Sequence, residues 1–309
     1  MIKNKILLRE LEINSLYAEG QIDATRRKEL IEELPIIDES YLAAVIEYFG
    51  NNSVMVERAR LELDQINAAK ATGEVVVKKE RIPLPNYSLA EELWNSISHG
   101  LGAIFGILVL IFSILALVTK SNITGNPIDG YELGAAIVYS VSIMILYTIS
   151  CIYHALGRNA GKKVMRVLDH DMVYLLIAGT YTPFCICALR EVMIFNVVPL
   201  GWLIFAIVWV QAIIGITFNS INIQKYKVLS MVLYITMGWT IIFAAAPLMD
   251  QMGVLPFVLL LLGGISYTVG SILYGIGAKK KGMHSVFHFF VLVASFLQFA
   301  AIYVGIFIK

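Results

Sequence analysis

Seven long apolar stretches limit what this chain can fold into more than any other feature of its sequence. They cover roughly residues 97–119, 134–156, 171–189, 196–218, 228–248, 254–277 and 286–308. Each approaches the ~20 residues that a helix needs to cross the hydrocarbon core of a bilayer. Backbone polar groups find no water there, so such stretches fold as helices. We therefore predict an all-α membrane protein, a seven-transmembrane helix bundle.

Charged residues are spread unevenly along the chain. They make up only 15% of it, against roughly 25% in a soluble domain. Residues 1–90 alone hold 15 of the 23 acidic and 12 of the 24 basic residues. We therefore expect a helical, soluble N-terminal domain with its linker (residues 1–88), followed by a membrane domain (residues 89–309). Met1–Glu39 lacks the apolar core and small-residue cleavage site of a signal peptide, so none is expected.

Capping residues and apolar periodicity divide the N-terminal domain into short helices. The expected segments are an apolar stripe from Ile6 to Leu16, Ala24–Leu34 capped by Asp23, a helix to Phe49 capped by Ser40, a helix ending near Lys70, and a linker over Gly73–Ser88. Several short amphipathic helices are typical of a small bundle or of a module that docks a cytoplasmic partner. No nucleic-acid partner is expected.

Lysine and arginine gather on alternate connections between the apolar stretches. Twelve lie before the first stretch or in the second, fourth and sixth connections: Lys78, Lys79, Arg81, Arg158, Lys162, Lys163, Arg166, Lys225, Lys227 and Lys279 to Lys281. The remaining connections and the C-terminus carry Lys120, Arg190 and Lys309. Basic residues favour the cytoplasmic side, so we expect a cytoplasmic N-terminus and an outside C-terminus, in a bacterial plasma membrane.

This topology brings all five histidines of the chain to the cytoplasmic ends of the helices. They are His99 in the first stretch, His154 at the end of the second, His170 beside Asp169 at the start of the third, and His284 and His288 at the start of the seventh. The last two are four residues apart and therefore share one helix face. Ionisable residues inside a membrane are costly and often mark a functional site.

Neutral imidazole is the commonest zinc ligand in proteins, and three ligands plus a water form the usual catalytic arrangement. We predict that His154, His284 and His288 bind a zinc ion. Ser150 lies one helical turn from His154, and Asp169 is a candidate general base, water-orienting group or extra ligand. Position alone leaves interfacial histidines without a metal as an equal alternative.

A structural role is favoured over a ligand role for the other polar groups of the membrane helices. His99 is expected to bond to neighbouring helices, and His170 faces about 100° away from Asp169 around its helix. The third stretch is the shortest, because polar residues and a proline interrupt it. Interhelical hydrogen bonds are expected for Thr180, Tyr181, Thr182 and Gln211.

Several motifs in order resemble the bacterial hemolysin III family, which belongs with the progestin and adiponectin receptors and more distantly with alkaline ceramidases. They are Glu91-Glu-Leu-Trp-Asn95-Ser-Ile-Ser-His99-Gly, Ser150-Cys-Ile-Tyr-His154, Leu168-Asp169-His-Asp, Ala178-Gly-Thr-Tyr-Thr-Pro183 and His284-Ser-Val-Phe-His288. The resemblance runs from about Leu89 to the C-terminus. It implies a seven-helix zinc-binding fold in which the three histidines hold zinc, with Ser150 and Asp169 around its water. Residues before Leu89 depart from compact bacterial members and suggest regulation or tethering.

Three functions are compatible with these features. The first is a zinc-dependent hydrolase of a lipid amide or ester at the cytoplasmic leaflet, with a membrane lipid as substrate. The second is a receptor-like sensor with structural zinc and a lipid as ligand. The third is a hemolysin or pore, which the lack of a sustained polar stripe on the outer halves of the helices disfavours.

Overall fold

The computed structural model describes residues 4–72, 84–277 and 281–309. Most of the expected linker, and the basic residues Lys78, Lys79, Arg81, Lys279 and Lys280, lie outside the described residues. The chain divides into two compact units, Met1–Glu80 and Arg81–Lys309, each of which is treated by itself below.

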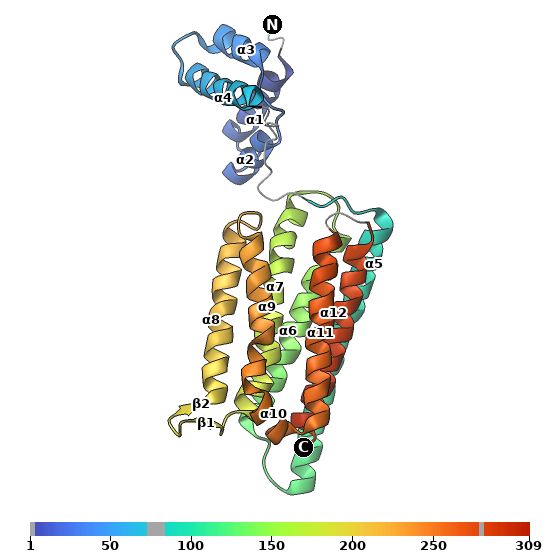
Figure 1. Cartoon of the computed structure of the whole chain (residues 1–309). Helices are drawn as coiled ribbons and strands as arrows, with labels where there is room; N and C mark the ends of the chain where they lie inside the picture. Colours follow the sequence, from blue (N-terminus) through green and yellow to red (C-terminus); the bar gives the residue numbers. More distant parts are fainter. Residues whose placement is uncertain (1–3, 73–83, 278–280) are drawn as a thin grey trace. The chain divides into compact units, whose positions relative to one another are not determined.

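Four helices make up the described part of the N-terminal unit (Figure 1): α1 (Lys5–Ala18), α2 (Ala24–Glu32), α3 (Glu39–Phe49) and α4 (Val54–Ala71). Asp23 caps α2 as predicted, since its carboxylate accepts the Arg26 N–H at 2.7 Å. The predicted cap of α3 is wrong, because Asp38 and not Ser40 occupies that position. The Asp38 carboxylate accepts the Tyr41 N–H, while the Ser40 hydroxyl donates to the same carboxylate.

The core of this unit combines apolar side chains with one buried carboxylate. Leu7, Val45 and Val56 are almost fully buried. Glu10 is 3% exposed, accepts a hydrogen bond from the Tyr41 hydroxyl and lies 3.6 Å from the Arg58 guanidinium. Burial and the Glu10 carboxylate raise the pKa of Tyr41, which keeps its hydroxyl a donor.

The described part of the membrane unit contains seven helical segments long and apolar enough to cross a membrane, which confirms the predicted fold class. They are α5 (Leu89–Thr124), α6 (Gly130–Ala155), α7 (Ala160–Pro183) extended by η1 (Phe184–Ala188), α8 (Leu200–Ile221), α9 (Lys227–Trp239) continued by η2 (Thr240–Ala244) and α10 (Ala245–Met252), α11 (Val254–Gly277), and α12 (Met283–Ile302) extended by η3 (Tyr303–Phe307). A small hairpin of β1 (Met193–Ile194) and β2 (Val198–Pro199) joins η1 to α8.

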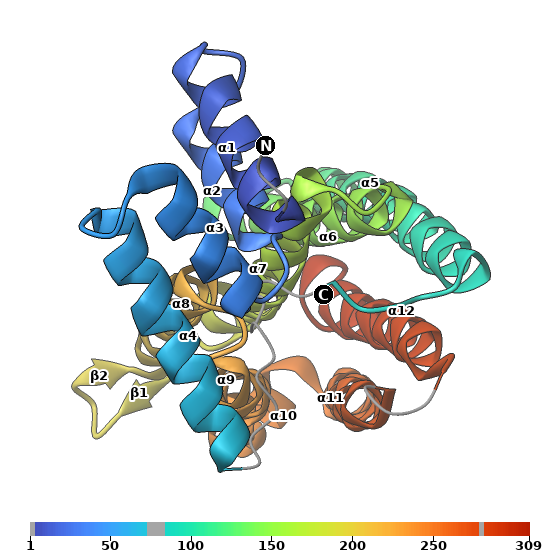
Figure 2. The ribbon, with the colours of Figure 1, turned by 90° about the horizontal axis from the view of Figure 1, so that it is seen from above.

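The spanning helices form a ring in which chain neighbours from α5 to α9 pack side by side (Figure 2). α12 packs against both α11 and α5 and so closes the ring. Close approach depends on glycine at the tightest crossing of α5 and α6. A Cβ on Gly102 would lie only 2.5 Å from the Tyr147 ring. Small residues serve this purpose in membrane bundles, where lipid provides no hydrophobic drive for helix association.

Several spans begin elsewhere than hydropathy indicates, among them α5, which begins at Leu89 rather than near residue 97. α7 begins at Ala160 rather than near residue 171, with Asn159 as its N-cap, so Asp169 lies well inside the helix. Its polar first turns escaped detection because their charges face protein, and Lys162 is only 2% exposed. α8 begins at Leu200 because the preceding residues form the hairpin.

Candidate metal centre

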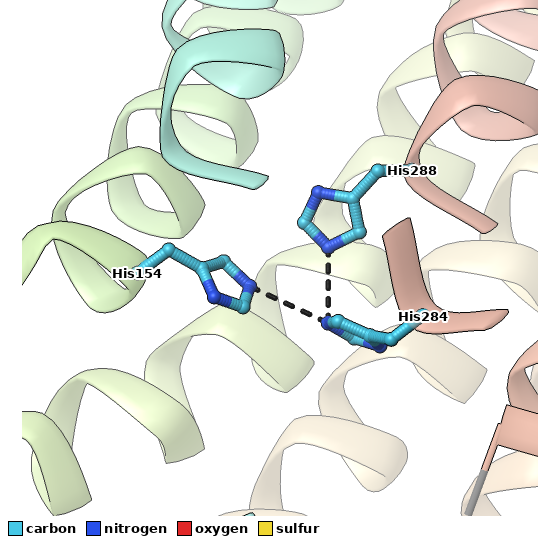
Figure 3. A group of neighbouring side chains, drawn as sticks. All are labelled: His154, His284 and His288. Atoms are coloured by element: carbon cyan, nitrogen blue, oxygen red, sulfur yellow. Dashed lines mark hydrogen bonds between the residues drawn. The ribbon is translucent and has the colours of Figure 1, made fainter. Parts of the chain in front are cut away.

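Three histidine rings point toward one another at one end of the bundle (Figure 3). We call this the site end; α5, α7 and α12 begin there and α6 ends there. His154 belongs to the last turn of α6, and His284 and His288 to the first two turns of α12. His154 and His288 are 2% and 1% exposed, and His284 is 8% exposed.

The ring nitrogens of these histidines have the spacing that a metal requires. The Nε2 atom of His284 lies 3.4 Å from Nε2 of His154 and 3.1 Å from Nε2 of His288. Zinc–nitrogen bonds of about 2.0–2.1 Å in tetrahedral geometry place ligand nitrogens about 3.3–3.4 Å apart. One ligand atom from each histidine lies within 4.8 Å of the other two. The cluster can therefore hold a metal ion.

Hydrogen bonding alone satisfies this arrangement poorly. A neutral imidazole carries one N–H, so its two nitrogens cannot both donate. Nε2 of His284 faces two other Nε2 atoms, and a single N–H there can serve only one of them. A cation shared by three lone pairs resolves the conflict.

Glu92 fixes the ring of His154 from outside the cluster. Its Oε2 lies 2.7 Å from Nδ1 of His154, and its Oε1 accepts from Nζ of Lys162 at 2.6 Å. A carboxylate can only accept, so Nδ1 carries the proton and Nε2 presents its lone pair to the cluster. The Lys162 ammonium balances the charge of Glu92, which makes the half-buried carboxylate tolerable.

The first turn of α5 also positions the start of α12. Ser88 and Glu91 form a capping box, in which the Glu91 side chain accepts the Ser88 N–H and the Ser88 hydroxyl accepts the Glu91 N–H. The second Glu91 oxygen accepts the N–H of Gly282 at 2.7 Å. Gly282 has φ +81°, a left-handed conformation that favours glycine, immediately before α12. His284 and His288 are thereby held opposite His154.

His99 and His170 lie near the cluster without belonging to it. His99 is 3% exposed, and its ring stacks on that of His288 with centroids 3.7 Å apart and planes 21° apart. Within the described residues neither His99 nitrogen has a hydrogen-bond partner, so the expectation that it bonds to neighbouring helices is wrong. The His170 backbone carbonyl accepts from Tyr234, and its ring packs edge-on to Tyr274.

The expected interhelical hydrogen bonds are found only in part. The Tyr181 hydroxyl donates to the Gly238 carbonyl and accepts the Ile241 N–H. Thr180 instead donates to the Leu176 carbonyl of its own helix at 2.7 Å. Thr182 also donates within α7 and accepts a long bond from Trp209. The Gln211 Oε1 has no partner among the described residues.

A cavity of about 150 Å³ opens beside the cluster, between α7, α9, α11 and α12. Ser150 and Asp169 line it together with His284 and His288. Asp169 is half-buried, and its accessible part faces this space. The remaining lining is mainly apolar and aromatic, including Val173, Ile177, Tyr267, Phe287 and Val291.

Fold and site together define an integral membrane protein with seven spans and a buried three-histidine cluster. The sequence profile described as "Haemolysin-III related" matches residues 87–299, and the chain belongs to that family. This confirms the family to which the motifs pointed. The helices α1 to α4 lie outside the matched region.

The relatives include bacterial and mammalian proteins. "Hemolysin-3" of Bacillus cereus is 39% identical over 209 residues, 68% of this chain and 89% of the relative. "Hemolysin-3 homolog" of Bacillus subtilis (strain 168) is 34% identical over 213 residues, 69% of this chain and 93% of the relative. "Monocyte to macrophage differentiation factor" of Homo sapiens is 24% identical over 182 residues, 57% of this chain and 71% of the relative. No solved structure matches the chain significantly.

Sequence reasoning missed two residues at the site, Glu92 and Tyr87. Glu92 shares a helix face with Asn95 and His99, at spacings of three and seven residues. This polar stripe on an otherwise apolar helix was a readable signal. Tyr87 stacks on His284 with centroids 4.8 Å apart, and no pattern in the sequence points to that contact.

Proposed function

We propose that the protein is a zinc-dependent hydrolase of a lipid amide or ester, with the site end at the cytoplasmic leaflet. The convergence of three Nε2 atoms beside a mainly apolar cavity carries this proposal. His154, His284 and His288 would hold the ion. Bound there, zinc would supply a Lewis acid and a water that is nucleophilic at neutral pH.

The chain's own side chains fit the proton transfers of such a hydrolysis. Asp169 lies in the cavity wall, where its carboxylate can accept a proton from the water that attacks the carbonyl carbon. As the bond from carbonyl carbon to nitrogen or oxygen breaks, the same proton can pass to the departing amine or alcohol. Ser150 lines the same cavity and would orient the Asp169 carboxylate for both steps.

The cavity favours a membrane lipid over a water-soluble substrate. Its lining is mainly apolar, while its polar groups gather beside the histidines. A lipid would therefore place its carbonyl near the cluster and an acyl chain along α7, α11 and α12. The carbonyl of a lipid near the headgroups lies at a depth that suits the site end.

A receptor-like sensor with structural zinc is the second candidate. The N-terminal unit, which lies outside the family match, favours it because a sensor needs a part that passes on its state. Two bacterial relatives, "Hemolysin-3" and "Hemolysin-3 homolog", carry names that refer to hemolysis. A pore ranks third for this chain, because the cavity is mainly apolar and offers ions no continuous polar lining.

The test uses purified protein in bilayers that contain ceramides, N-acyl lipids and phospholipids, with released fatty acid and bound zinc as readouts. Wild type should bind about one zinc per chain and release fatty acid from one lipid class. Asp169→Asn should retain zinc while hydrolysis falls by roughly 10²-fold or more. His284→Ala/His288→Ala should lose both.

The outcomes separate the candidates. A fall of zinc affinity together with activity in Asp169→Asn would make Asp169 a ligand rather than a base. Zinc bound at one per chain with no zinc-dependent release from any lipid class would favour the sensor. Unchanged metal content in the double histidine variant would mean that the assigned ligands are wrong.

A further inference from the structure

An irregular segment before α5 covers the histidine cluster at the site end. We call Leu84–Ser88 the strap. The ring of Tyr87 stacks on that of His284, with centroids 4.8 Å apart and planes 14° apart, and lies 5.8 Å from the ring of His154. The strap therefore contacts two of the three proposed ligands through Tyr87.

Arg158 ties the strap to the helix that carries His154. Its Nη1 donates to the Pro85 carbonyl and to Oδ1 of Asn86, both at 2.9 Å. Its Nη2 donates to the Leu84 carbonyl at 3.3 Å. Arg158 follows His154 by four residues, in the connection between α6 and α7. One guanidinium thus holds three consecutive residues of the strap, a geometry that suits its planar fork of donors.

The strap accounts for the burial of polar groups at this end. Nδ1 of His284 is buried and has no partner among the described residues, and the Tyr87 ring covers the face of that imidazole. The strap is also the point at which the chain passes from the membrane unit toward the N-terminal unit, and the family match begins at Tyr87.

We propose that the strap is a lid on the metal centre, with Tyr87 as its cover and Arg158 as its latch, and that it limits exchange of metal and water with the site. This regulation rests on the proposed function in so far as the site holds zinc. The lid limits the access of water to the histidine cluster, and this access can be measured without a metal.

Two readouts test the lid in the full-length protein. The first is the rate at which a chelator removes zinc; Arg158→Ala and Tyr87→Ala should each raise it at least about tenfold, because each removes contacts that hold the strap closed. The second is the rate at which a charged, water-soluble thiol reagent modifies His288→Cys, in a protein whose native Cys151, Cys185 and Cys187 are replaced. The same two substitutions should speed this reaction.

Two control substitutions resemble the lid variants in kind but leave the contacts of the strap in place. Tyr87→Phe retains the stacked ring and should behave as wild type. Arg190→Ala removes an arginine at the opposite end of the bundle, where it pairs with Asp129 at 3.3 Å, and should change neither rate. Tyr87→Ala leaves Arg158 intact, so agreement between the two lid variants excludes a folding defect peculiar to one of them.

Rates that stay at the wild-type level in both lid variants, in both readouts, would overturn the lid. If the wild type binds no zinc, the zinc proposal fails but the thiol reaction still decides the lid. Faster zinc removal with unchanged thiol reaction would also overturn it, because an open strap must expose the thiol introduced by His288→Cys to water.

Discussion

Glu92 offers the sharpest test of the metal centre, because it touches a proposed ligand without being one. In Glu92→Gln the side chain keeps its shape but holds one acceptor oxygen instead of two. The Lys162 ammonium, whose side chain is 3% exposed, donates to the Leu156 carbonyl and also to residue 92, so the amide oxygen should turn toward this cation. The amide NH₂ then faces Nδ1 of His154, which must give up its proton to accept.

The tautomer of His154 would then be reversed, with the proton on Nε2, where it competes with the metal. Loss of such a partner typically lowers metal affinity 10–100-fold, or about 1.4–2.8 kcal/mol. Competitive titration against a chelator of known affinity, on protein in bilayers, measures this change. Glu132→Gln is the matched control, because the Glu132 carboxylate pairs with Lys120 at 2.8 Å and lies in the first turn of α6, at the other end of that helix from His154.

A double variant tests whether the Lys162 ammonium is the cause of the reversed tautomer. In Glu92→Gln/Lys162→Met the competing ammonium is gone, so the amide oxygen is free to accept from Nδ1 of His154. We expect this double variant to regain most of the lost affinity. Equal losses in the single and double variants would refute the tautomer argument, and wild-type affinity in Glu92→Gln would refute the orienting role altogether.

Two further predictions concern topology and the N-terminal unit. After the three native cysteines are replaced, cysteines introduced at Gly157 and Asp250 should react with a thiol reagent from opposite sides of the membrane of sealed cells, the one at Gly157 from the inside. Reaction of both from the outside would place the histidine cluster in the outer leaflet. Asp38→Ala should destabilise α3 by about 0.5–2 kcal/mol, measured by hydrogen exchange of the Leu42 amide at pH 7. The Ser40 hydroxyl and the Tyr41 N–H hold the pKa of Asp38 below its ordinary value, so the capping contribution is full above about pH 4 and fades as the pH falls further. Exchange that is insensitive to the substitution at pH 7 would contradict the capping role.

Hydropathy predicted the seven spans because each helix that crosses a bilayer needs about 20 mainly apolar residues. It located the third poorly, since Lys162 and Arg166 made the first turns of α7 resemble a loop. Those charges are tolerated because they face protein partners such as Glu92, and a single-sequence hydropathy average cannot register a partner. In the N-terminal unit, Asp38 and Ser40 were both plausible caps, and only backbone geometry chooses between them.

The three proposed ligands could be predicted from the sequence. Two of them are four residues apart on one helix face, and the third ends a span on the same side of the membrane. For Glu92 the sequence shows only the polar stripe that it forms with Asn95 and His99, and for Tyr87 it shows no pattern at all. The contact of Glu92 with His154 bridges 62 residues and depends on how α5 packs against α6. That of Tyr87 with His284 depends on an irregular segment whose path no periodicity describes.

The arrangement of the helices separates the three-histidine cluster from much of the cavity wall. α6 and α12 supply the three histidines, and α5 braces them through Glu92, the stacked ring of His99 and the bond from Glu91 to Gly282. α9 and α11 supply none of the three, yet they contribute much of the cavity wall: Met231, Tyr234, Ile235, Gly238, Trp239, Gly264, Tyr267, Thr268, Ser271 and Tyr274. Substitutions on these two helices can therefore change the shape of the cavity while the spacing of the three imidazoles stays the same. Under the proposed hydrolase function, the choice of lipid is therefore set by other residues than the metal ligands.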